Sequence, residues 1–297
     1  MIVVVLGLSG AIFYGASDFL GAFAARRIPL VTATLFNYVV ATVTIFGALL
    51  LVGGTWSVGA VEAGTVCGVL AVFGLLAFYG VLAIGPMSLL SPLIALIQSV
   101  VPVAAAVITG QALTPIAWVA IGLGIVALLL LAPRSEPGRT HITRRGAALA
   151  VASGLLLGSS LVALDFAPHN SGVVPSVLEI VAGLVVLAIV WLAIRFIPRR
   201  RALAFLQPGS DAVATLSAHR AWIAAAGSGV LVAVADALII LDLHVGNLAI
   251  VSVLVALYPV LTVILAATVL KERMTKLQFV AVGLVVVASL LFSATTT

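Results

Sequence analysis

The sequence predicts an all-α integral membrane protein in which ten transmembrane helices form two inverted five-helix repeats. Composition gives the first reason, because 64% of the 297 residues are hydrophobic, only 8% are charged, and the mean hydropathy is +1.37. A soluble domain carries about 25% charged residues. Apolar runs of spanning length recur along the chain, and two long segments match each other without a gap. These observations leave no room for a separate soluble domain.

Ten apolar runs are long enough to cross a bilayer, which takes about 20 predominantly apolar residues for a helix. In order, they are 2–24, 30–52, 58–84, 87–109, 115–133, 146–166, 173–197, 220–243, 247–270 and 277–294. We expect the first run to remain a membrane helix and not a cleaved signal peptide. It has no basic segment ahead of it, and it contains an acid.

Basic residues predict the orientation of these helices. The 14 Lys and Arg residues follow the first, fifth, seventh and ninth runs, whereas the alternate loops and both ends have none. Basic loops remain on the cytoplasmic side. We therefore expect a multi-pass protein of the cell membrane with both termini outside. The net charge of +5 fits short loops resting against an anionic leaflet.

An internal repeat is the third observation. Residues 85–130 align with 246–291 without a gap. The shared positions include Gly85 with Gly246, Ser91 with Ser252, and Gly122 with Gly283. Because five helices per unit is an odd number, the second copy must enter the membrane upside down, as in many secondary transporters. We expect the first repeat over 1–133, a cytoplasmic linker over 134–145, and the second repeat over 146–297.

Acids inside the apolar runs are the strongest functional signal. An ionised carboxylate at the centre of a spanning helix costs about 2.5–3.5 kcal/mol. Asp18, Glu179 and Asp236 have no Lys or Arg at a similar depth in any run. Each must therefore be protonated, face a water-filled cavity or hold a cation, and the default interpretation of such acids is functional. Asp242, close to the end of its run, is expected to reach water.

Polar and aromatic residues on the same helix faces complete the predicted site. On the first run, Gly7, Gly10, Tyr14, Ser17, Asp18 and Gly21 recur at helical spacing and form one small, polar stripe. We expect Asp18 to lie on that packing or cavity-lining face. The predicted substrate or proton site consists of Tyr14, Asp18, Asn37, Tyr79, Gln98, Glu179, Asp236 and Tyr258.

Several stretches resemble the EamA-type carriers of the drug/metabolite transporter superfamily. They are "FYGASDFLGAFAARR" (13–27), "FYGVLAIGPMSLLSPLIALIQSVVP" (78–102) and "YPVLTVILAATVLKERMT" (258–275). Here "KERMT" is similar to the family's Gly-Glu-Arg-Leu-Thr signature with Lys271 in place of glycine, and "GQALT" (110–114) occupies the matching place in the first repeat. The resemblance implies transport of small metabolites, amino acids or drugs. It brings no universal catalytic residue with it.

These features favour a secondary carrier, in the export direction and driven by a proton or exchange gradient, with a small molecule and the lipid bilayer as its partners. An excess of buried acid over buried base favours an amine substrate or proton antiport. Two alternatives stay open: an intramembrane enzyme with an Asp18–Asp236 dyad, and an ion channel. We expect no catalytic residue, cofactor, metal or nucleic-acid partner, and either a monomer or a homodimer. The single Cys67 excludes an intramolecular disulfide.

Overall fold

The computed structural model describes residues 1–25, 27–84, 87–131, 144–196, 217–258, 260–261, 264–265 and 276–295. Within these ranges the regular secondary structure is helical. The helices are α1 (Ile2–Ala25), α2 (Leu30–Val52), α3 (Val58–Ile84), α4 (Met87–Ile108), α5 (Pro115–Leu131), α6 (Arg144–Asp165), the short η1 (His169–Ser171), α7 (Val174–Phe196), α9 (Ala218–Val245), α10 (Leu248–Val255) and α12 (Lys276–Thr295).

Six of the described helices are long and apolar enough to cross a membrane, so the chain is a multi-pass membrane protein. They comprise Ile2–Ala25, Leu30–Val52, Val58–Phe78, Gly146–Asp165, Val174–Ile194 and Ala218–Val245. Shorter apolar helices cover 96–108, 115–130 and 276–292. The helix bounds lie close to the predicted runs, and those of α2 and α3 coincide with them.

The described residues of the predicted run 247–270 are helical from 248 onward, apart from one turn. Its regular helix, α10, ends at Val255, and a turn follows over residues 256–257. There the Leu257 N–H donates to the Leu254 carbonyl at 3.2 Å, a bond between residues three apart. The sequence offers a cause in Pro259, because proline has no N–H to donate to the carbonyl four residues earlier, which belongs to Val255 at the end of α10. Residues 266–270 lie outside the described part of the chain.

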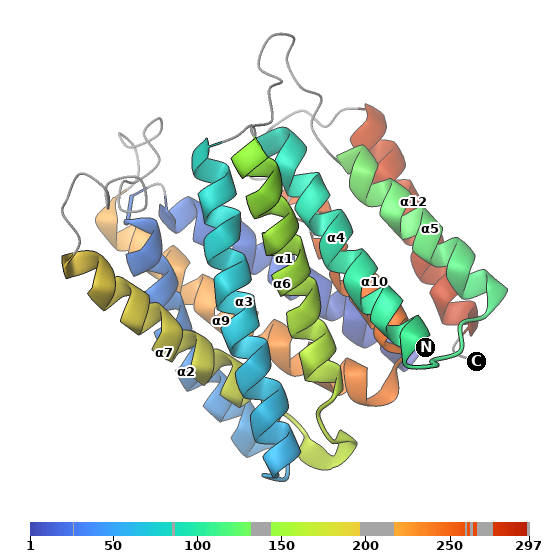
Figure 1. Ribbon diagram of the computed structural model, residues 1–297, viewed down its shortest axis with the longest axis horizontal. Helices are drawn as coiled ribbons and strands as arrows, with labels where there is room; N and C mark the ends of the chain where they lie inside the picture. The colour runs from blue at the N-terminus through green and yellow to red at the C-terminus, as the bar shows by residue number, and fades with distance from the viewer. Residues whose placement is uncertain are drawn as a thin grey trace.

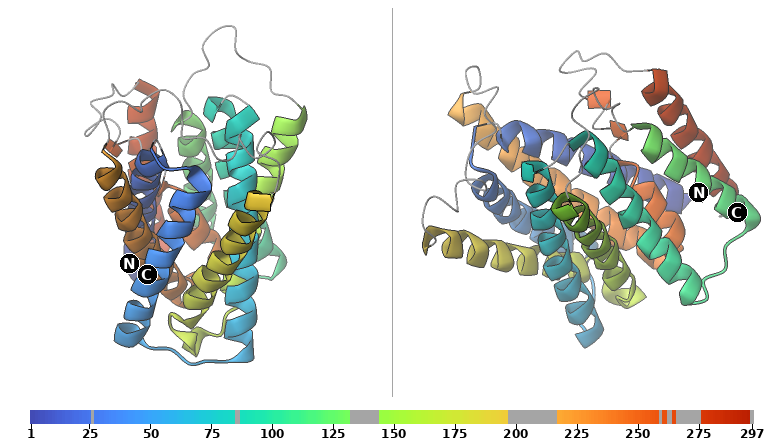
Figure 2. Two further views of the ribbon diagram at one scale, coloured as in Figure 1. Left: turned by 90° about the vertical axis from the view of Figure 1, so that its left-hand side faces the viewer. Right: turned by 45° about the horizontal axis from the view of Figure 1, so that its top comes forward.

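Helices from distant parts of the sequence pack against one another (Figure 1). The largest interfaces pair α1 with α9, α3 with α6, α3 with α7, α5 with α12, α4 with α6, and α2 with α9. Figure 2 shows α5 and α12 side by side at one edge of the molecule. The beginning of α1, the end of α9 and the beginning of α10 lie together at what we term the α9–α10 end of the bundle.

Glycines allow two of these helix pairs to approach closely. A Cβ atom at Gly64 would lie 2.2 Å from the Pro175 carbonyl oxygen, and one at Gly68 would lie 2.2 Å from the Glu179 carbonyl oxygen, so α3 rests on the backbone of α7. At Gly229 of α9 a Cβ atom would lie 2.4 Å from the carbonyl oxygen of residue 37 on α2. Small residues at helix crossings are the usual way in which membrane helices pack.

Candidate substrate and proton site

Several residues of the small stripe of α1 face α9. A Cβ atom at Gly10 would lie 3.1 Å from Ile239, and one at Gly21 would lie 3.2 Å from the Ser228 hydroxyl oxygen. Residues near the start of α1 therefore contact the end of α9, and those near its end contact the middle of α9. The two helices run antiparallel along a seam to which Gly10 and Gly21 contribute close contacts on the α1 side.

A buried polar triad joins α1, α2 and α9. The Ser17 hydroxyl donates to the Ser228 carbonyl at 2.9 Å, and the Ser228 hydroxyl donates to the Ser17 carbonyl at 2.8 Å. The Asn37 side-chain amide donates to the Ser228 hydroxyl oxygen at 2.7 Å. The side-chain amide of Asn37, a predicted site residue, therefore has a hydrogen-bond partner within the protein. In this conformation Asn37 connects α2 to α9.

Two of the predicted acids lie together at the centre of the bundle. The Tyr14 hydroxyl of α1 donates to Oδ1 of Asp236 on α9. Glu179 of α7 lies within electrostatic range of Asp236, and Cys67 of α3 lies within hydrogen-bonding range of Glu179. With Ser160 of α6, which interacts with the Cys67 thiol, these side chains form what we term the carboxyl cluster.

The carboxyl cluster is buried and acidic. Asp236 is only 5% exposed, and Oε2 of Glu179 is buried without a hydrogen-bond partner among the described residues. Neither Lys nor Arg contributes to the described surroundings of the two acids. Two buried carboxyl groups within electrostatic range of each other disfavour a state in which both are ionised. The cluster can therefore hold a proton between α7 and α9.

Asp18 lies outside this cluster. Ser17 occupies the contact with α9, whereas Asp18, the next residue, is exposed. One residue along a helix turns a side chain by about 100°, which is enough to take Asp18 off the seam. Its carboxylate lies within electrostatic range of Tyr258, beyond the end of α10. Tyr258 in turn lies beside Tyr14, with 6.4 Å between the ring centroids. That Asp18 lines a cavity stays a prediction.

Two predicted site residues stand apart from these groups. Gln98 lies on α4 where that helix meets α6, and its side-chain Oε1 is buried without a partner in the described part of the structure. The side chain of Tyr79 lies outside the described residues, so its predicted role stays a prediction.

Sequence reasoning missed two polar residues at the α9–α10 end. Asp242 was expected to reach water, but its side chain is fully buried. Gln111, in the loop between α4 and α5, donates from Nε2 to Oδ2 of Asp165 at 3.3 Å and accepts the backbone N–H of Leu248 at 3.0 Å. The only available signal for Gln111 was its repeat position, where the second copy has Glu272.

No group of three or more His, Cys, Asp or Glu side chains that could hold a metal ion occurs in the part of the chain that the structure describes. The donors in the carboxyl cluster include two carboxyl groups, a phenol and a thiol. Their arrangement suits the binding and release of a proton or of a cationic group.

Comparisons with known proteins agree with this architecture. The model of the EamA-like transporter family matches residues 144–294. A solved crystal structure is similar over 99% of this chain and 97% of its own, with a TM-score of 0.73 and 17% sequence identity, which shows a shared fold. No curated protein matches. The chain belongs to the EamA-like transporter family, within the drug/metabolite transporter superfamily, and is thus a multi-pass membrane transporter.

Proposed function

We propose that the chain is a secondary carrier that exports small metabolites, amino acids or drugs by alternating access, in exchange for protons. The observation that carries the proposal is the pair of buried acids, Glu179 and Asp236, which Tyr14 links to α1. These groups come from helices of both predicted repeats. A proton moving on or off the pair would change contacts between the two halves, as coupling in a carrier requires.

The packing of the helices supports the inverted repeat. If α1–α5 correspond in order to α6, α7, α9, α10 and α12, then the α1–α9 interface corresponds to that of α6 with α3. Likewise, the α2–α9 interface corresponds to that of α7 with α3. The pairs α2–α7, α4–α10 and α5–α12 each map onto themselves. Exchange of partners in this way is what a two-fold relation between the halves produces.

Asp18 is proposed as the group that meets the substrate. It is exposed, although it lies within a spanning helix, and its described neighbour Tyr258 supplies an aromatic ring and a hydroxyl. A carboxylate near tyrosine rings suits a substrate that bears an amine, through charge attraction and cation–π contact. Asn37, Tyr79 and Gln98 would contribute polar contacts in other conformations of the transport cycle.

The test is transport by purified protein in proteoliposomes. A tolerance screen in overexpressing cells supplies candidate substrates, and counterflow of the best hit then measures exchange. We expect Asp18→Asn to abolish counterflow or to remove its pH dependence. Glu62→Gln is the matched control, because Glu62 is exposed at the beginning of α3, away from the cluster. Unchanged counterflow with an unchanged pH profile in Asp18→Asn would overturn the role of this acid.

The alternative of an aspartyl dyad receives no comparable support. Asp236 is bonded to Tyr14 and lies beside Glu179, whereas the described electrostatic contact of Asp18 is with Tyr258. A protease dyad needs its two acids within hydrogen-bonding distance around one proton. No peptide hydrolysis is expected, and detection of it in detergent would favour the enzyme alternative over the carrier.

A further inference from the structure

Asp242 is an acid whose side chain lacks a polar partner among the described residues. It lies in the last turn of α9, it is 0% exposed, and neither carboxyl oxygen has a hydrogen-bond partner in that part of the structure. Its backbone carbonyl accepts the Gly246 N–H at 2.7 Å, so only the backbone of this residue is satisfied. Asp236, two turns earlier on the same helix, differs because it receives the Tyr14 hydroxyl.

The surroundings of this carboxyl group are apolar and tightly packed. A Cβ atom at Gly7 of α1 would lie 2.7 Å from Oδ2 of Asp242 and 3.0 Å from Cβ of Leu254 on α10. The neighbouring Ile239 and Leu243 of α9 are also buried. Asp242 is therefore enclosed where α1, α9 and α10 meet, and an ionised carboxylate there would have neither water nor a counter-charge.

The occupant that fits this site is a proton. Metal cations such as Ca²⁺ and Mg²⁺ need about six or more oxygen ligands. Neither oxygen of the Asp242 carboxyl group has a polar partner among the described residues, and Gly7 and Leu254 lie so close to this point that a Cβ atom at Gly7 would contact both Oδ2 and Leu254. A neutral carboxylic acid needs no additional ligand, and it avoids the cost of a buried unpaired charge.

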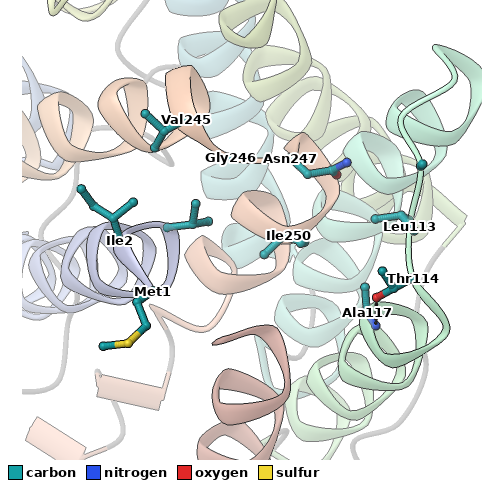
Figure 3. Close-up of a pocket in the computed structure, with 11 residues that line it drawn as sticks. Met1, Ile2, Leu113, Thr114, Ala117, Val245, Gly246, Asn247 and Ile250 are labelled. Carbon is teal, nitrogen blue, oxygen red and sulfur yellow. Dashed lines mark hydrogen bonds between the residues drawn. The ribbon is translucent and has the colours of Figure 1, made fainter. Parts of the chain in front are cut away.

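A pocket is lined by Val245 and Gly246, which follow Asp242 by one helical turn in the sequence (Figure 3). It has a volume of about 300 Å³, and its lining includes Met1, Val3, Thr114, Gly246 and Asn247. Val3 and Gly246 belong to the pocket wall, and a Cβ atom at Gly246 would lie 2.9 Å from the backbone carbonyl oxygen of Asp242 and 3.0 Å from Val3 Cγ1. Separation of α1 from α9 at this end would therefore open the carboxyl group to the pocket.

The other described titratable groups at this end do not neutralise Asp242. They are the Met1 amine at the start of α1, Asp165 of α6, His169 of η1 and His244 of α9. The ring of His169 stacks on that of His244 with centroids 5.9 Å apart, and Asp165 accepts from Gln111. Residues 248–255 of α10 contain no charged side chain. None of these groups bonds to either oxygen of Asp242.

We propose that Asp242 is a second proton-binding site, occluded in this conformation and opened to the pocket when α1 and α10 separate from α9. The evidence for the proton site is the packing of α1, α9 and α10 around the Asp242 carboxyl group. Its part in coupling rests on the proposed carrier function. In the predicted orientation the pocket lies on the outer side, so Asp242 would exchange its proton with the external solution.

Infrared spectroscopy of the full chain in nanodiscs tests the site without any substrate. The wild type should show a carboxylic-acid C=O band at neutral pH that is absent from Asp242→Asn, a variant nearly isosteric with the protonated acid. Asp165→Asn is the control, because Asp165 has a polar partner at the same end. An unchanged band in Asp242→Asn would overturn the proposal.

A second variant, Gly7→Ala, provides an independent test in case Asp242→Asn does not fold. Gly7→Ala places a methyl group against Oδ2 and should shift the frequency of the band without removing it. If the band that vanishes in Asp242→Asn keeps its frequency in Gly7→Ala, the carboxyl group does not lie against residue 7, and the enclosed site proposed at this crossing is overturned.

A transport assay tests the role of Asp242 in coupling. It uses proteoliposomes that contain a pH-sensitive dye in the lumen, with the substrate identified by counterflow. Asp242→Asn should retain substrate counterflow and lose the proton movement that accompanies net transport. Net transport with wild-type proton movement would refute the coupling role. If the wild type transports no tested compound, the carrier proposal fails, and the infrared result still decides whether Asp242 binds a proton.

Discussion

Replacing Gly64 by alanine should loosen the contact between α3 and α7. The new Cβ atom would lie 2.2 Å from the Pro175 carbonyl oxygen and 2.8 Å from Leu178 Cβ. Carbon and oxygen atoms in close contact lie about 3.3 Å apart, so the helices must separate by about 1 Å. Overpacking of this kind costs about 1–3 kcal/mol. Alanine has a better helix propensity than glycine, which offsets up to about 1 kcal/mol of this cost. We therefore expect a net loss of folding stability.

The single cysteine provides the assay. Cys67 is 1% exposed, so a thiol-reactive fluorogenic dye should report unfolding of the detergent-solubilised protein on heating. Each kcal/mol lowers Tm by about 2–4 °C in a chain of roughly this size. Because Cys67 is close to Gly64 in sequence, tryptophan fluorescence serves as the second readout.

Two further glycines make the test specific. A Cβ atom at Gly47 of α2 would have no heavy atom within 4 Å, so Gly47→Ala should leave Tm unchanged or raise it. Gly229→Ala should lower Tm as Gly64→Ala does, since its Cβ atom would lie 2.4 Å from the Asn37 carbonyl oxygen. The reasoning would be refuted by a Tm for Gly64→Ala equal to or above that for Gly47→Ala.

Three other outcomes follow from the described contacts. Tyr14→Phe removes the only described hydrogen bond to the Asp236 carboxyl group, and should cost about 1–3 kcal/mol in thermal unfolding and slow transport. Gln111→Ala breaks two bonds at the α9–α10 end and should cost about 1–2 kcal/mol, measured in the same way. In a Cys67→Ala background, an impermeant maleimide applied to intact cells should label Thr55→Cys but reach Ala218→Cys only after permeabilisation, as the basic-loop rule requires.

Helix positions were predictable because length and apolarity alone determine which segments can span a bilayer. The bounds of α2 and α3 needed no tertiary information. In the ninth run, α10 ends four residues before Pro259, a residue at which the sequence indicates a break in the backbone pattern, and residues 258, 260–261 and 264–265 are again helical. The apolar composition of the run continues through the break, so a criterion based on apolar length extended the span across it.

The candidate site was only partly predictable. Glu179 and Asp236 were recognised as unpaired acids, but their proximity depends on α7 and α9 meeting at the centre of the bundle, for which no local pattern exists. The α1 stripe was wide enough to include both Ser17 and Asp18, and only the packing shows that Ser17 faces α9. Asp242 was misjudged because closeness to a helix end suggests water, whereas α1 and α10 cover that end.

The α1–α9 seam combines two kinds of contact that respond differently to motion. In its middle, Ser17 and Ser228 are joined by bonds of 2.8–3.0 Å, which tolerate little displacement. On either side, Gly10 and Gly21 contribute contacts without interlocking side chains, which resist sliding and tilting less. The Tyr14–Asp236 hydrogen bond also crosses the seam, so a tilt of α1 against α9 is expected to pivot in the segment between Ser228 and Asp236. Asp242 lies closer to the end of α9 than that segment, so it would move more relative to α1. A proton site whose proton exchange depends on this tilt must open at such a position.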